Sequence, residues 1–141
     1  PEICRELTLP ALKALTAKFK RAGIVTSLHS CGKERALVEM AAKETDLDCI
    51  DPLEVPPMGD CDLAEIKGKF GAKLALKGNL HTTEVMLRMK PEQIIEEARK
   101  VIDIGKPGGG FILSTGDQCG RDTPDRNIRA LLEACERYGQ Y

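Results

Sequence analysis

Residues 24–32 read Ile-Val-Thr-Ser-Leu-His-Ser-Cys-Gly, an apolar run that ends in two side chains able to bind a metal. The apolar part is typical of a short strand, and Gly23 in front of it is typical of the end of a helix. Residues two apart on a strand point to the same side, so His29 and Cys31 are expected to face one ligand. This stretch therefore predicts a helix, a strand and a polar rim in direct succession.

The alternation of helix and strand continues along the chain. Its periodicity predicts strands at 24–29, 49–54, 74–80 and 111–114, and helices at 8–23, 34–44, 60–70 and 91–105, with a short helix capped by Thr82 or Thr83 and a last one at 123–139. Strands that alternate with helices indicate parallel pairing through right-handed crossovers. Two α/β closures fit: a doubly wound sheet, or half of a (βα)8 TIM-type barrel, which needs about 200 residues or more when complete.

Composition predicts one globular domain over residues 1–141, because 42% of the residues are apolar. The 21 Lys and Arg residues nearly balance the 22 Asp and Glu residues and form no basic stripe, which argues against nucleic-acid binding. No apolar run approaches the roughly 18 residues of a membrane span. The six scattered cysteines contain no C-x-x-C pair, so we expect a reduced, cytoplasmic protein. Pro1 in place of Met suggests a fragment or a processed piece.

Metal-binding or polar side chains follow all four predicted strands, at the rim where α/β proteins build their sites. They are His29 and Cys31, then Glu54, then Asn79 and His81, and finally Cys119. Three ligands with one open position are typical of a catalytic zinc site. We therefore predict zinc bound by His29, Cys31 and Cys119, with Glu54 as a fourth ligand that substrate displaces.

Several other polar residues are candidates for supporting roles. We expect His81 and Asn79 to contact the substrate or cofactor, and Asp117 and Asp122 to orient the ligands. Cys61 follows the second strand's loop and is disfavoured as a ligand, whereas Cys4, Cys49 and Cys135 are expected to be packing residues. Gly108-Gly109-Gly110 precedes its strand, so a tight turn is favoured over a phosphate loop.

The chain resembles the second half of the uroporphyrinogen decarboxylase superfamily. The resemblance rests on Leu28-His29-Ser30-Cys31-Gly32, on Phe111-Ile112-Leu113-Ser114-Thr115-Gly116, on Cys119-Gly120, and on Thr123-Pro124 before Asn127-Ile128. Within that superfamily, His-x-Cys followed by a distant Cys resembles the cobamide-dependent methyltransferases, including the methylcobamide:coenzyme M methyltransferases.

This resemblance implies a (βα)8 barrel of which the chain supplies the fourth helix and the fifth to eighth strand–helix units. It implies zinc on His29, Cys31 and Cys119, with Glu54 at a spacing similar to that of the Glu ligand in zinc-dependent methionine synthases. The expected reaction moves a methyl group between a corrinoid, carried by a partner protein, and a zinc-activated thiol; the catalytic candidates are Glu54, His81 and Asp117.

Two alternatives remain open. One is decarboxylation of a tetrapyrrole, although decarboxylases of the superfamily lack the His-x-Cys pair. The other is a catalytically inert barrel fragment, or a module that binds a corrinoid partner. Because four strands cut from a barrel would have two free edges, we also expect pairing with an N-terminal half or with a second copy.

Overall fold

The computed structural model describes all residues from Pro1 to Tyr141. Four parallel strands form one sheet in the order β1-β2-β3-β4. The strands are β1 (Ser27–His29), β2 (Cys49–Asp51), β3 (Ala75–Leu80) and β4 (Phe111–Thr115). The helices are η1 (Cys4–Thr8), α1 (Leu9–Arg21), α2 (Arg35–Glu44), α3 (Leu63–Phe70), η2 (Thr82–Leu87), α4 (Pro91–Gly105) and α5 (Asp125–Tyr138).

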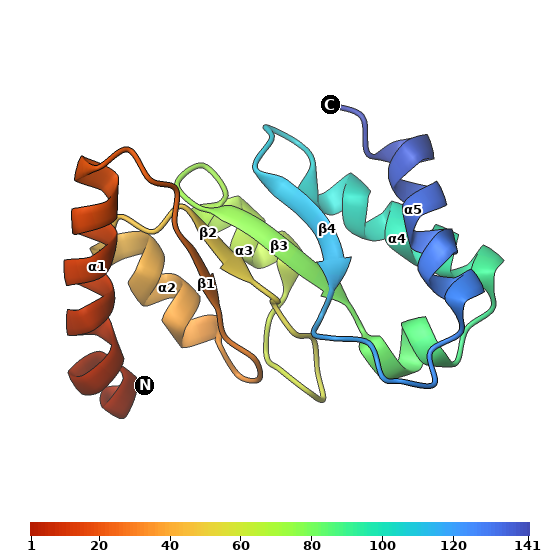
Figure 1. Cartoon of the computed structure of the whole chain (residues 1–141), viewed down its shortest axis with the longest axis horizontal. Helices are drawn as coiled ribbons and strands as arrows, with labels where there is room; N and C mark the ends of the chain where they lie inside the picture. Colours follow the sequence, from red (N-terminus) through yellow and green to blue (C-terminus); the bar gives the residue numbers. More distant parts are fainter.

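The order of the strands decides between the two closures that the sequence left open. A doubly wound sheet reverses its strand order at a switch point. Here each strand pairs with the next one along the chain, as in a (βα)8 barrel. The α/β prediction of four parallel strand–helix units preceded by one helix is therefore confirmed. Figure 1 shows α1 beyond β1 at one end of the molecule and α4 with α5 beyond β4 at the other.

The hydrophobic core forms two clusters on the helix-covered face of the sheet. The first joins α1, α2 and α3 to the strands and includes the fully buried Ile50 and Leu76. The second joins η2, α4 and α5 to the end of β3 through Leu80, Met86 and Ile94. Burying one such side chain contributes about 1.5–3 kcal/mol. The two clusters therefore fix the strands from one side and leave the other side for polar groups.

The opposite face of the sheet carries a row of polar side chains. His29 pairs in register with Asp51, and the register of β2 with β3 places Lys77 next in the same row. Side chains in register on neighbouring strands point to the same face. This helix-free face is the inner wall that a barrel would close.

Two predicted strands are shorter than their apolar runs suggest. β1 begins at Ser27 because the Ile24 N–H donates to the Phe19 carbonyl at the end of α1 and stays out of the sheet. β2 ends at Asp51 rather than Glu54 because Leu53 has a left-handed backbone with φ of 59°. No helix of the chain has both the length and the apolar character needed to cross a bilayer.

Candidate metal centre

Three potential ligands meet at the carboxyl ends of the strands. One ligand atom each from His29, Cys31 and Asp117 lies within 4.8 Å of the others. His29 Nε2 is 3.0 Å from Cys31 Sγ, and Cys31 Sγ is 3.3 Å from Asp117 Oδ2. A nitrogen, a sulfur and an oxygen at these separations fit a single zinc ion with one position left open.

The loops after β1 and β4 bring these groups together from the two outer strands of the sheet. In a flat sheet, three strand spacings would place β1 and β4 about 14 Å apart. His29 ends β1, whereas Asp117 follows β4 by two residues, and yet His29 Nε2 is 3.8 Å from Asp117 Oδ1. Curvature of the sheet and the course of the rim loops together therefore bring the ends of β1 and β4 closer than a flat sheet would.

Asp51 orients the imidazole of His29. Its Oδ2 lies 3.0 Å from His29 Nδ1 and also accepts from Lys77 Nζ at 3.2 Å. In the neutral ring this bond places the proton on Nδ1, so the lone pair of Nε2 faces Cys31. The same hydrogen bond raises the pKa of His29 above its ordinary value. Asp51 is nearly buried and is fixed by Lys77, so the ring has one preferred direction.

The Cys31 thiol is held protonated by its carboxylate neighbour. The hydrogen bond to Asp117 raises the pKa of Cys31, with burial and further carboxylates adding to the effect. The pKa of Asp117 is lowered, first by the Gln118 N–H and then by the Cys31 thiol. A metal that binds here must displace the thiol proton, so its affinity should rise with pH.

Two glutamates shape the rim beside this group. Glu54, which is 6% exposed, accepts a hydrogen bond from the Gly32 N–H at 2.5 Å, one residue beyond Cys31. Glu34 is 1% exposed, and its Oε1 accepts from the Leu53 N–H at 2.6 Å. Burial raises the pKa of Glu34 to about 7. Glu34 thus holds the backbone turn that carries Glu54 to the rim.

The other predicted site residues take different places. Cys119 lies outside the three-ligand group and packs against the second core cluster, and burial raises its pKa. Its role as a zinc ligand stays a prediction. Asn79 is buried at the end of β3, and His81 caps η2 in place of the expected Thr82 or Thr83. Asp122 is exposed beside Arg121.

Cys61 is buried in the first core cluster, where burial raises its pKa to about 12. A thiol that stays protonated in an apolar environment is a packing residue, which agrees with the low rank of Cys61 among the ligand candidates.

Sequence reasoning missed Asp51, Lys77 and Glu34. The signal for the first two was the strand register, because Asp51 and His29 occupy equivalent positions near the ends of adjacent parallel strands. Glu34 had no such signal, since a Glu before a helix is usually a solvent-exposed residue.

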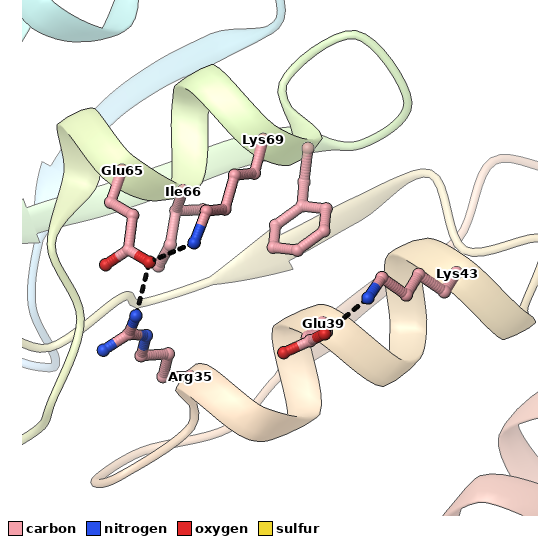
Figure 2. A pocket seen from close by; sticks show the side chains of 7 residues that line it. Arg35, Glu39, Lys43, Glu65, Ile66 and Lys69 are labelled. Carbon is pink, nitrogen blue, oxygen red and sulfur yellow. Dashed lines mark hydrogen bonds and ion pairs between the residues drawn. The ribbon is translucent and has the colours of Figure 1, made fainter.

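A groove on the outer helix layer lies away from this rim. It lies between α2 and α3 and has a volume of about 320 Å³. Figure 2 shows its charges paired with one another: Glu65 meets both Arg35 and Lys69, and Glu39 meets Lys43. These pairs satisfy the polar groups on the surface and leave no convergent set of groups for chemistry.

The chain is similar in sequence to the proteins of one known family. Residues 1–138 match the family model described as uroporphyrinogen decarboxylase (URO-D). The chain belongs to the uroporphyrinogen decarboxylase family. A family member from Magnetococcus marinus, named uroporphyrinogen decarboxylase, is 27% identical over 96% of this chain and 37% of its own length. Another with the same name, from Dechloromonas aromatica, is 32% identical over 56% of this chain and 22% of its own length.

A solved structure with a similar fold comes from a differently named protein. A methyltransferase from Methanosarcina mazei superposes with a TM-score of 0.80, 21% identity, and coverage of 99% of this chain and 38% of that chain. This likeness supports the partial barrel fold described above. The chain spans less than two fifths of the length of these relatives.

Proposed function

We propose that the chain is the metal-bearing part of a zinc-dependent methyltransferase of the uroporphyrinogen decarboxylase family, which moves a methyl group between a corrinoid and a thiol. The convergence of His29, Cys31 and Asp117 at one point of the rim carries this proposal. Their donor atoms suit zinc, and a free position suits a substrate. The corrinoid and the partner protein that carries it are inferred from the resemblance alone.

Zinc, when bound, supplies a Lewis acid that lowers the pKa of a thiol, so that the thiolate acts as nucleophile at neutral pH. The residues around the site orient the candidate ligands for such an ion. Asp51 fixes the direction of the His29 ring, and Asp117 accepts the hydrogen bond of the Cys31 thiol, whose proton a bound metal ion would replace. Glu54 lies outside the three-ligand group but accepts a hydrogen bond from Gly32, one residue beyond Cys31, and it is the candidate for a displaceable fourth ligand.

Cys119 and Asp117 are competing third ligands in this proposal. Both belong to the loop after β4, but Asp117 is the one whose oxygen lies near Cys31 in the structure. A loop rearrangement that brings the Cys119 thiolate inward would release Asp117 to accept hydrogen bonds from the ligands.

Tetrapyrrole decarboxylation is the second candidate function, favoured by the name that the curated relatives carry. Decarboxylation would need neither His29 nor Cys31 as metal ligands. The two candidates therefore differ in what the removal of Cys31 should do.

Elemental analysis of the purified chain tests the proposal. We expect one zinc per chain, and X-ray absorption should show nitrogen or oxygen together with sulfur neighbours. The Cys31→Ala variant should lose most of the metal, whereas Cys61→Ala should keep it, since Cys61 is buried in the core.

The ligand question is settled by comparing Cys119→Ala with Asp117→Asn. Loss of a sulfur neighbour in the first variant would make Cys119 the third ligand; loss of metal only in the second would make it Asp117. A chain without bound zinc, whose full-length form decarboxylates uroporphyrinogen and still does so after Cys31→Ala, would overturn the proposal.

A further inference from the structure

A small polar cavity lies beside the metal centre at the ends of β2, β3 and β4. Glu54, Asn79, His81 and Gly116 contribute to its wall. Its volume is about 10 Å³, which is about the room that one buried water needs. Glu54 and Asn79 are each more than nine-tenths buried, whereas Met58 in the same wall is 55% exposed, so the cavity is a polar recess that opens to the surface on one side.

The hydrogen bonds of His81 fix which ring nitrogen carries the proton. The backbone N–H groups of Thr83 and Glu84 both donate to His81 Nδ1, each at 3.1 Å. A nitrogen that accepts two donors holds no proton, so the proton of the neutral ring is on Nε2. His81 Nε2 is buried and has no hydrogen-bond partner in the protein. An N–H in that state costs free energy unless something accepts from it.

Glu54 supplies the complementary group in the wall of the same cavity. Its Oε2 is engaged by the Gly32 N–H, which leaves Oε1 as an available acceptor. The occupant of this cavity must accept from an N–H and donate to a carboxylate. A hydroxyl oxygen does both, whereas a carboxylate or phosphate would be repelled by Glu54 and an ammonium group cannot accept from His81.

We propose that His81 and Glu54 form a subsite for a single hydroxyl oxygen, supplied by a hydroxyl-bearing ligand or, when none is present, by an ordered water. The oxygen accepts from His81 Nε2–H and donates to Glu54. This subsite goes beyond the proposed methyl transfer, because it requires no metal and gives His81 a defined role as a hydrogen-bond donor.

The two histidines of the chain make a direct test feasible. A long-range proton–nitrogen spectrum of ¹⁵N-histidine-labelled, metal-free chain should show one ring with its proton on Nε2, and that ring should disappear in His81→Gln. Its Nε2–H should show a cross-peak to water and exchange with solvent at least about tenfold more slowly than a free imidazole.

Methanol, the smallest hydroxyl probe, separates the two sources of the oxygen. If a hydroxyl ligand can enter, methanol should shift the Nε2–H resonance in a saturable way, while acetonitrile, which cannot donate to Glu54, should not. If only water fits, methanol should have no such effect and the water cross-peak should persist. Either result supports the subsite. A methanol shift would make a ligand hydroxyl its occupant, and a persistent water cross-peak without that shift would make the occupant water.

Glu54→Gln provides a second variant that leaves the cap of η2 intact. The amide presents a donor toward the cavity, so the Nε2–H should exchange faster than in the parent chain. A His81 ring with its proton on Nδ1, a doubly protonated ring at pH 7, or an Nε2–H that exchanges as fast as free imidazole would overturn the proposal. None of these readouts depends on zinc or on methyl transfer.

Discussion

At the scale of single residues, the candidate centre is supported by a carboxylate outside the three-ligand group. Asp51 fixes His29 through Nδ1 and is in turn fixed by Lys77. Partners that orient a metal-binding imidazole are typically worth a factor of 10–100 in metal affinity. This row of three side chains lies on the helix-free face, where no core packing would hold His29 otherwise.

We expect Asp51→Asn to weaken zinc binding about 10- to 100-fold while the chain stays folded. The amide can no longer act as a charged acceptor for both His29 and Lys77. Competition with a zinc-binding dye would measure the affinity, and circular dichroism would check the fold. Asp103→Asn, on the exposed side of α4, is the matched control. Equal affinities for the two variants would refute the orienting role of Asp51.

Glu34 should make stability depend on pH. Its pKa is about 7 in the folded chain against 4.5 in the unfolded one, so the folded state keeps the proton over an interval in which the unfolded state has lost it. Stability therefore falls as pH rises from about 4.5 to 7, by up to about 3 kcal/mol, and is flat above.

Glu34→Gln should remove this decline, because the amide oxygen still accepts from the Leu53 N–H and carries no charge at any pH. Urea unfolding at pH 5 and pH 8 measures the difference between the variant and the parent chain. The variant should gain stability relative to the parent at the higher pH. Glu92→Gln on the exposed start of α4 serves as control, and parallel pH profiles for parent and Glu34→Gln would contradict the prediction.

At the scale of elements, two helical glycines differ in the space around them. Gly105 ends α4 so close to β4 that an added Cβ would overlap the ring of Phe111. Gly68 lies in α3 with nothing within 4 Å of an added Cβ. Overpacking typically costs 1–3 kcal/mol, whereas Gly→Ala in an exposed helix stabilises by roughly 0.5–1 kcal/mol.

We therefore expect Gly105→Ala to lower the melting temperature and Gly68→Ala to raise it. For a chain of this size, each kcal/mol corresponds to a shift of about 2–8 °C. Differential scanning calorimetry on both variants would check the signs. If both substitutions moved the melting temperature in the same direction, the close packing of α4 on Phe111 would be in doubt.

Sequence periodicity predicted the elements better than it predicted the site. Helix starts at Pro91 and near Pro124, and the rim positions of His29 and Cys31, follow from local rules that operate within a few residues. The end of β2 does not follow from local rules, because the Leu53 N–H donates to the buried carboxyl of Glu34, which lies 19 residues away in the sequence. The approach of Asp117 to Cys31 depends on how two distant loops fold over the sheet, which no local pattern encodes.

At the scale of the whole molecule, the sheet has two outer strands with one neighbour each, β1 and β4. Ile112 on the helix-free face of β4 is 51% exposed, and Val25 before β1 is 80% exposed. Unpaired edges beside apolar side chains favour association with another chain. An N-terminal half or a second copy would satisfy the same surface.

We expect the isolated chain to associate with itself as its concentration rises, and Ile112→Lys to weaken that association by placing a charge on the bare face. Size-exclusion chromatography with light scattering measures it. Ile104→Lys, on the outer side of α4, is the control and should leave association unchanged. A parent chain that remains monomeric across the accessible concentration range would contradict this expectation.

The meeting of the rim loops also bears on how the chain unfolds. The two core clusters meet through Val101 and Leu113, and an ion bound among candidate ligands from the first and the last strand would add a second link between them. Amide hydrogen exchange should then slow in α2 and α5 alike when metal is added, although neither helix touches the ion. A metal ion bound at the rim would thus increase the cooperativity with which the two core clusters unfold.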